Sequence, residues 1–209
     1  GTVKDLRLRK YEPRPMLTTE AHDVLRPRFP VIDAHNHLGD AFHSRSDAWL
    51  SRPVSDLVAT LDESGVRTVV NLDGRWGDRL RAELAGYMEP HPERFVVFSG
   101  VDYDNFASDP SFGETEARRL RESVAIGARG LKVWKTLGLR LRDTQGQLIP
   151  VNDARLDPLW VTAGELGVPV LIHVADPVAF FQPLDRFNER WEELGRDPDG
   201  PLTGVDVDA

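Results

Sequence analysis

The chain has 209 residues, enough for one good-sized hydrophobic core but too few for two comfortable domains. Its 40% hydrophobic and 29% charged residues are typical of a soluble globular protein. The formal net charge of −8 argues against nucleic acid or an anionic membrane surface as a partner, and no apolar run is long enough to span a bilayer.

The sequence contains no cysteine, which excludes disulfides and thiolate metal sites. Any bound metal must therefore be held by histidine, carboxylate, lysine or water. No charged-then-apolar signal segment opens the chain. The chain starts with Gly1-Thr2-Val3 rather than with Met, and one interpretation is that a leader or tag has been removed. The sequence does not decide between a cytoplasmic protein and one that is exported after removal of a leader.

The chain order predicts three regions. Residues 1–28 are basic and punctuated by proline, and we expect an extended arm. Residues 29–195 form the predicted domain, and residues 196–209 are a tail rich in Gly, Pro and Asp.

Within the domain, apolar segments with strand character alternate with segments of helical period. Predicted strands cover residues 29–37, 67–72, 95–101, 130–135 and 168–174, and predicted helices cover 54–61, 80–88, 114–126 and 157–166. Asp73-Gly74 is interpreted as a turn after the second strand. Near-continuous apolar strands separated by helices predict an α/β fold with a parallel sheet, and five such units make up about five-eighths of a (β/α)8 barrel.

The first strand ends in Asp33-x-His35-x-His37. Side chains alternate along a strand, so these three would share one face near its carboxyl end. His173 closes the fifth strand in the same way, and in a parallel barrel all these ends meet at one mouth. Three imidazoles with an open position are typical of a catalytic zinc site, although a structural role for each histidine is the alternative.

The motif Asp33-x-His35-x-His37, the segment Gly-Leu-Lys-Val-Trp-Lys at 130–135 and the histidine that ends Val-Leu-Ile-His173 together resemble the amidohydrolase superfamily. The likeness is closest to amidohydrolase family 2, a group of metal-dependent TIM-barrel hydrolases and decarboxylases. It covers about residues 29–175. The resemblance implies that His35, His37 and His173 bind a divalent metal, most simply zinc.

The same resemblance places Lys132 where some relatives have a strand-four lysine, with Lys135 as the alternative. The family's strand-six histidine and strand-eight aspartate have no counterpart after His173, so we expect the N-terminal part of a longer barrel. Asp176 is the nearest candidate for a general base. Asp33 is a candidate for orienting the histidines, and His43 and Trp49 are candidate substrate contacts in the loop after the first strand.

The function expected from these residues is a metal-dependent hydrolase that attacks an amide, ester or lactone of a small-molecule substrate. A non-oxidative decarboxylase of the same superfamily is the first alternative. A non-catalytic barrel fragment that binds a metal or a partner is the second. An incomplete sheet would also leave an open edge through which the chain could self-associate.

Overall fold

The computed structural model describes residues 6–20, 22–23, 25–39, 49–174 and 176–196. His43 and the tail at 197–209 lie outside the described residues. The chain divides into two compact units, one formed by Val24–His173 and the other by Gly1–Asp23 together with Val174–Ala209.

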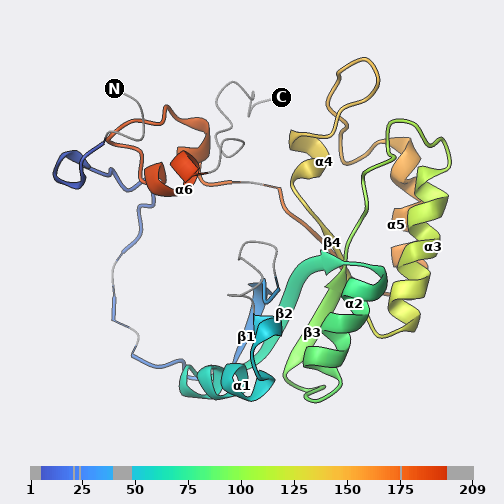
Figure 1. Ribbon diagram of the computed structural model, residues 1–209, viewed down its shortest axis with the longest axis horizontal. Coiled ribbons are helices and arrows are strands. Elements are labelled where there is room, and N and C mark those ends of the chain that lie inside the picture. Colours follow the sequence, from blue (N-terminus) through green and yellow to red (C-terminus); the bar gives the residue numbers. More distant parts are fainter. Residues whose placement is uncertain (1–5, 21, 24, 40–48, 175, 197–209) are drawn as a thin grey trace. The chain divides into compact units, whose positions relative to one another are not determined.

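Unit Val24–His173 is built on a parallel sheet of five strands in the order β1-β2-β3-β4-β5 (Figure 1). The strands are β1 (Val31–Asn36), β2 (Val66–Arg75), β3 (Phe95–Ser99), β4 (Leu131–Val133) and β5 (Val170–Ile172). The main connecting helices are α1 (Val54–Glu63), α2 (Gly77–Glu83), α3 (Phe112–Ala125) and α5 (Asp157–Leu166). Consecutive parallel strands joined through helices form a partial TIM barrel, which confirms the predicted fold class.

Shorter helical turns complete the chain. They are η2 (Leu8–Lys10), η3 (Trp49–Ser51), η4 (Leu84–Met88), α4 (Thr136–Leu139), η5 (Ala154–Leu156), η6 (Val178–Phe181) and α6 (Trp191–Arg196). The helix predicted at 80–88 is therefore two elements, because the α-helical α2 passes into the π-helical turn η4 at Leu84.

The predicted turn at Asp73-Gly74 is wrong, because β2 runs through both residues to Arg75. Gly74 has φ +63°, a conformation that glycine adopts without steric penalty, and the register with β3 shifts between Asn71 and Arg75. The Asp-Gly pair thus forms a β-bulge inside the strand rather than a chain reversal. This bulge carries Asp73 into the region where the histidines lie.

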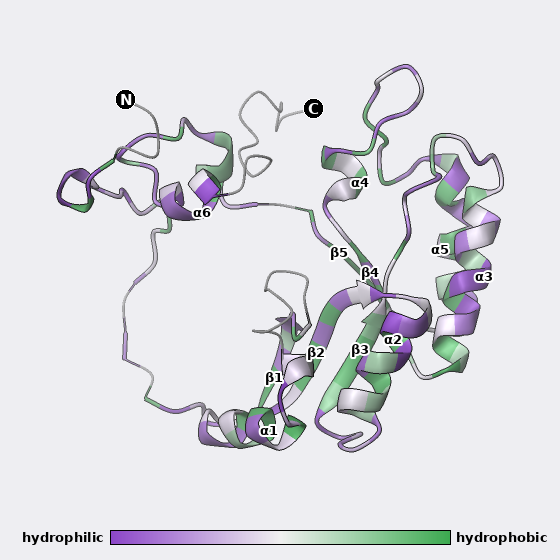
Figure 2. Cartoon of the chain, in the orientation of Figure 1, coloured by the Kyte–Doolittle hydropathy of each residue, from purple (hydrophilic) through white to green (hydrophobic). Residues whose placement is uncertain are grey.

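Buried side chains fill the space between the sheet and its helices. Leu57 and Leu61 of α1 pack with Val69 and Phe95, while Leu159 of α5 belongs to a cluster that also includes α3 and β4 residues. In Figure 2 strand β3 is hydrophobic along much of its length, as expected for a strand covered on both faces. Fully burying one such leucine contributes about 1.5–3 kcal/mol, so this packing dominates the stability of the unit.

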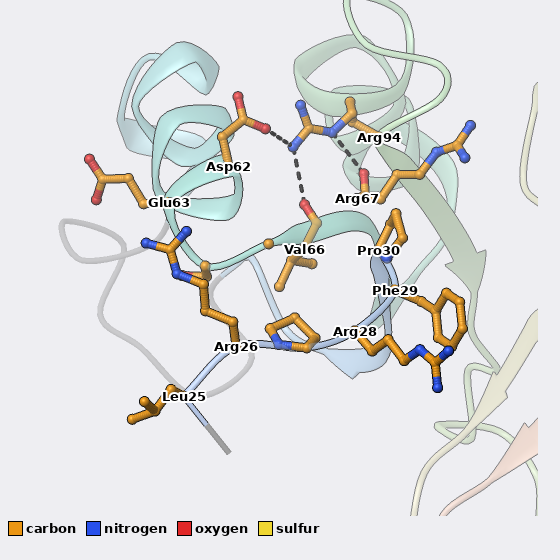
Figure 3. Close-up of a pocket in the computed structure, with 13 residues that line it drawn as sticks. Leu25, Arg26, Arg28, Phe29, Pro30, Asp62, Glu63, Val66, Arg67 and Arg94 are labelled. Atoms are coloured by element: carbon orange, nitrogen blue, oxygen red, sulfur yellow. Dashed lines mark hydrogen bonds and ion pairs between the residues drawn. The ribbon is translucent and has the colours of Figure 1, made fainter. Parts of the chain in front are cut away.

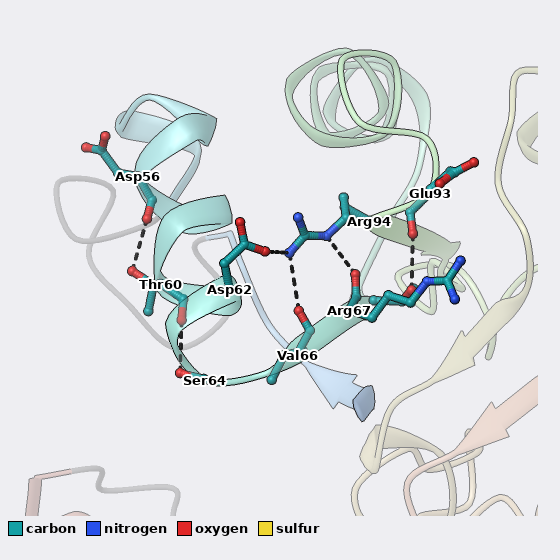
Figure 4. A network of polar contacts seen from close by, with 9 residues as sticks. Asp56, Thr60, Asp62, Ser64, Val66, Arg67, Glu93 and Arg94 are labelled. Carbon is teal, nitrogen blue, oxygen red and sulfur yellow. Dashed lines mark hydrogen bonds and ion pairs between the residues drawn. The ribbon is translucent and has the colours of Figure 1, made fainter. Parts of the chain in front are cut away.

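The amino ends of the strands are held by a polar network around Arg94 (Figure 4). Its guanidinium Nη2 lies 2.7 Å from Oδ1 of Asp62 and 3.2 Å from the carbonyl oxygen of Val66, and Nε donates to the carbonyl of Arg67 at 2.7 Å. These bonds join the end of α1 to the starts of β2 and β3. A hollow of about 870 Å³ lies beside them, lined by residues 25–30 and 62–67 (Figure 3). In a barrel this end serves stability, so we assign the network and the hollow to the fold.

In the other unit, residues from the first and last parts of the sequence contact each other. The backbone N–H of Arg14 donates to the carbonyl of Phe187 at 3.0 Å, and the guanidinium carbon of Arg14 lies 4.1 Å from the centre of the Phe187 ring. The rings of Tyr11 and Trp191 have centroids 6.0 Å apart. These contacts tie residues 11–14 to residues 187–191.

Strands β1 and β5 stand at the two ends of the sheet order. Ile32 on β1 is 65% exposed, and Phe29 just before it is 70% exposed. Self-association through such an edge stays a prediction. Among the described residues, no helix has the length and apolar character needed to cross a membrane.

Candidate active site

Three aromatic or imidazole side chains follow directly after the last residues of their strands. His37 follows β1, Trp134 follows β4 and His173 follows β5. The backbone N–H of His173 donates to the carbonyl of Val133 at 2.9 Å. The pairing of β4 with β5 therefore fixes the position of the His173 backbone along the strand direction. The ends of parallel strands lie at one edge of a sheet, which is where barrel enzymes place their active sites.

His37 is held by a carboxylate from the neighbouring strand. Its Nδ1 lies 3.2 Å from Oδ1 of Asp73, and the Asp73 side chain is completely buried. This contact is a hydrogen bond when Nδ1 carries the proton, and in that tautomer Nε2 has the lone pair that can bind a metal ion. The His37 ring also lies against the Trp134 ring with a centroid distance of 4.9 Å. The indole Nε1 of Trp134 donates to the Asp73 carbonyl oxygen at 3.3 Å.

Asp73 lies next to a second buried carboxyl, that of Glu83 on α2. Burial, and next the charge of Asp73, raise the pKa of the Glu83 carboxyl to about 9, while Arg75 and Asn71 act in the opposite direction. Glu83 is therefore protonated at neutral pH and is a hydrogen-bond donor toward its neighbour. This proton lets two carboxyl groups share a buried position without two negative charges.

The backbone after His37 is fixed on both sides by polar side chains. The N–H of Leu38 donates to Oδ1 of Asn71 at 3.0 Å, and the Tyr87 hydroxyl donates to the Leu38 carbonyl oxygen at 3.0 Å. The next residue, Gly39, has no room for a side chain, because a Cβ atom there would overlap the carboxylate of Asp73. The segment that carries His37 is thus locked against β2 and the π-helical turn η4.

His35 lies among other nitrogen groups. Its ring centroid is 5.4 Å from that of His37. Burial lowers the pKa of the His35 imidazole, followed by the charges of Lys132, His37 and His173. Asp33 raises the same pKa, as the smallest contribution. A lowered pKa favours the neutral imidazole, the form that binds metal ions.

Lys132 is also fully buried near this edge, with 0% of its surface exposed. Its Nζ forms no hydrogen bond with any residue that the structure describes, and it lies 5.5 Å from the centre of the Trp134 ring. Burial lowers the pKa of this amine. A buried amine without a hydrogen bond is unusual, because burying an unpaired charge is costly. The catalytic role of Lys132 stays a prediction.

The predicted zinc site can be tested for chemical fit on these observations. Among the described residues, no group of three or more His, Asp or Glu side chains is arranged to hold a metal ion. The donor chemistry nevertheless fits a divalent metal, because His37 is oriented by a carboxylate at Nδ1 as metal-binding histidines usually are. The lowered pKa of His35 also favours a neutral ligand. Binding by His35, His37 and His173 stays a prediction.

The remaining predicted residues have mixed placements. Asp33 accepts the backbone N–H of His35 at 3.1 Å and the Nδ2 amide of Asn36 at 2.7 Å, so these two hydrogen bonds are local contacts and involve no imidazole ring. Trp49 packs at the margin of the cluster around α1. Asp176 belongs to the unit that contains residues 174–209, and its role as a base stays a prediction.

Sequence reasoning missed the residues that support His37. Asn71 and Asp73 interrupt an otherwise apolar strand at a spacing of two, which places them on one face, and this pattern was the available signal. Tyr87 lies with Leu80 and Leu84 on the apolar face of the helix predicted at 80–88, which indicates burial but no polar contact. Glu83 gave no signal, because charged residues on a helix are expected to face solvent. Only the contacts of these two residues across the fold identify them.

No protein-family model matches the sequence, and no curated protein matches it. Among solved structures, a 2,6-dihydroxybenzoate decarboxylase from Rhizobium is 17% identical with a TM-score of 0.48, over 71% of this chain and 51% of that chain. A probable 2-pyrone-4,6-dicarboxylic acid hydrolase from Acinetobacter baumannii is 19% identical with a TM-score of 0.42, over 77% and 55% of the two chains. An amidohydrolase from Mycobacterium avium subsp. paratuberculosis is 16% identical with a TM-score of 0.42, over 74% and 41%.

These three neighbours are members of the amidohydrolase superfamily, the superfamily that the sequence motifs resemble. The chain spans about half the length of the solved structures that it matches. Identities below 20% and TM-scores below 0.5 establish no residue's role in this chain.

Proposed function

We propose that unit Val24–His173 carries part of the active site of a metal-dependent hydrolase of the amidohydrolase type. His35, His37 and His173 would hold a divalent metal ion, with zinc as the first choice, next to a small-molecule substrate. The observation that carries the proposal is the Asp73 carboxylate 3.2 Å from Nδ1 of His37, at the end of the sheet where barrel enzymes react.

A metal ion held by neutral imidazoles supplies a water ionised near neutral pH and polarises a substrate carbonyl. The chain's own residues supply position and proton control. Asp73 would keep the His37 ring in one tautomer. The hydrogen bonds from Leu38 to Asn71 and from Tyr87 to Leu38 limit movement of the backbone beside the ring. Trp134 forms a flat apolar wall next to His37.

Lys132 supplies an amine whose pKa is lowered by burial. In its neutral form the amine accepts a proton, and in its charged form it stabilises negative charge that develops on a substrate oxygen. Either role requires the amine to reach the substrate, whereas a structural lysine would only fill the core. Asp176 remains the candidate for the general base of amide hydrolysis.

A non-oxidative decarboxylase is the second candidate, favoured by two arginine side chains, Arg75 and Arg79, in a pocket that Asp73 and Trp134 also line. Guanidinium groups suit an acid substrate. Analysis of products from a panel of esters, amides, lactones and carboxylic acids separates the two reactions, because only decarboxylation releases CO₂. Absence of turnover in a metal-loaded preparation would instead favour a non-catalytic metal-binding or partner-binding fragment.

Metal content tests the proposal directly. The purified chain and a His35→Ala, His37→Ala double variant are compared by elemental analysis after equilibration with zinc. The matched control is His22→Ala, which replaces an exposed histidine of the other unit. We expect bound metal in the parent chain and in the control, with strong loss in the double variant. Equal metal content in all three proteins would refute the assignment.

A further inference from the structure

The segment after β5 has little regular structure of its own. Residues 176–196 contain one four-residue turn, η6, and one six-residue helix, α6. Helices this short are not stable alone in water, because nucleating the first turn is unfavourable and few residues follow it. Within the segment, the side chain of Asn188 donates to the carbonyls of Ala179 and Pro183 at 2.8 and 3.2 Å. Further support comes from the beginning of the chain, which belongs to the same unit.

The N-terminal arm, blue in Figure 1, supplies a row of backbone donors to this segment. Alternate N–H groups of the arm donate to residues between 186 and 189. These bonds run from Glu12 to the Arg186 carbonyl at 3.0 Å, from Arg14 to the Phe187 carbonyl at 3.0 Å, and from Met16 to Oε2 of Glu189 at 3.3 Å. The residues between these donors are Pro13 and Pro15, which have no N–H. Every backbone donor from residue 12 to residue 16 therefore serves this one contact.

The two prolines also prepare the arm for this contact. A proline ring fixes φ at about −65° and biases the residue before it toward an extended conformation. Pro13 and Pro15 therefore favour an extended chain over residues 12–15 before the contact forms as well as within it. A segment restricted in this way loses less conformational entropy on docking than a flexible segment does.

Side chains of the arm add to the backbone contact. The Tyr11 hydroxyl donates to the carbonyl of Glu189 at 3.0 Å, and the Tyr11 ring lies 6.0 Å from the ring of Trp191, the first residue of α6. The guanidinium carbon of Arg14 lies 4.1 Å from the centre of the Phe187 ring, a distance suited to a cation–π contact. The arm therefore holds the start of α6 as well as the residues before it.

We propose that residues 11–16 are a built-in strap that orders the segment after β5. The segment is folded when the strap is docked, and it opens locally when the strap is released. It starts at Val174, directly after His173, so the order of the chain beside this predicted metal ligand depends on residues near the start of the sequence. Docking of the strap needs no metal ion or substrate, so it goes beyond the proposed function.

Amide hydrogen exchange of the full chain, read by mass spectrometry, tests the strap. Arg14→Pro removes both the backbone donor and the guanidinium that contact Phe187, and exchange of the amides at 187–194 should become faster by about tenfold or more. Exchange in β3 should not change, because this strand belongs to the other unit. Thr18→Pro is the matched control, since Thr18 is an exposed residue of the same arm and its N–H forms no hydrogen bond with any residue that the structure describes.

A synthetic peptide with the sequence of residues 6–18 separates release of the strap from general misfolding. It is added to the Arg14→Pro chain at about 5 mM, near the effective concentration that a short flexible tether provides. The parent peptide should restore most of the protection at 187–194, whereas the same peptide with the Arg14→Pro substitution should not. Equal results with the two peptides, including no restoration by either, would overturn the strap.

Tyr11→Phe gives a second, milder variant. It removes one hydrogen bond and keeps the ring, so exchange at 187–194 should rise by about twofold to tenfold. Equal exchange in the parent chain, Arg14→Pro and Thr18→Pro, or equal acceleration by the two proline substitutions, would overturn the strap. If these exchange results hold in a chain that takes up no zinc, the proposed function fails and the strap stands. Zinc uptake without the expected exchange pattern would overturn the strap alone.

Discussion

Nδ1 of His37 lies 3.2 Å from Oδ1 of Asp73, and the two residues belong to adjacent parallel strands or their ends. The contact orients the imidazole because a buried carboxylate needs a donor and His37 supplies it. The Glu83 carboxyl lies next to Asp73 and has a raised pKa, so it keeps its proton at neutral pH. The orientation of a predicted metal ligand thus depends on two carboxyl groups.

Replacing Asp73 tests this support. Asp73→Asn removes the negative charge that orients His37, and we expect zinc affinity to fall about tenfold to a hundredfold, as for other residues that hold metal-binding histidines. A competition titration against a chromophoric chelator measures the change. Asp78→Asn, at an exposed position on α2, is the control and should leave the affinity unchanged. An Asp73→Asn variant with parental affinity would show that the contact does not serve metal binding.

Glu83 makes stability depend on pH. Its pKa is about 9 in the folded chain and near 4.5 when unfolded, so between these values the unfolded chain binds fewer protons than the folded one. The free energy of unfolding should therefore fall as the pH rises from 5 to 9. Glu83→Gln, which imitates the neutral carboxyl, should lose less stability over this interval. Glu89→Gln, at an exposed position, should behave like the parent chain in the same thermal unfolding series.

Lys132 should cost the folded chain stability. The amine is fully buried and unpaired among the described residues, and burial lowers its pKa. We expect Lys132→Met to raise the free energy of unfolding by about 1–3 kcal/mol at neutral pH, because a side chain of similar length replaces an unsatisfied group. The gain should shrink as the pH rises toward the pKa of the unfolded lysine, since the parent chain no longer has to release a proton on folding.

Lys10→Met is the comparison, with an expected change of about 0.5 kcal/mol or less for this exposed lysine. Urea unfolding measures both variants, and product formation is followed in parallel. Stabilisation together with lost turnover would mark Lys132 as functional. If Lys132→Met lowers stability, the amine has a structural partner and the interpretation fails.

Gly39 should be intolerant of any side chain. A Cβ atom at this position would overlap the Asp73 carboxylate, so Gly39→Ala should lower the free energy of unfolding by about 1–3 kcal/mol. Gly164 within α5 has no atom within 4 Å of the corresponding position, and Gly164→Ala should raise stability by about 0.5–1 kcal/mol. If the packing is as described, urea unfolding of the two variants gives changes of opposite sign in the free energy of unfolding. A loss of similar size at both sites would contradict it.

The sequence by itself determined the order of elements. Apolar runs and helical periods are local properties, and they identified β1 to β5 and the main connecting helices α1, α2, α3 and α5, but not α4 in the loop after β4. The histidines at strand ends could be located for the same reason, because their distance along the chain from an apolar run is visible in the sequence. The parallel sheet and the partial barrel followed from this alternation.

Only the tertiary structure decided what surrounds those histidines. Asp73-Gly74 has the local signature of a turn, but pairing with β3 keeps the chain extended through a bulge and carries Asp73 to His37. Glu83 has the signature of a solvent-facing helix residue, yet α2 packs its carboxyl against Asp73. Both outcomes depend on residues brought together from separate elements, and the energy of a buried charge depends on those neighbours rather than on sequence period.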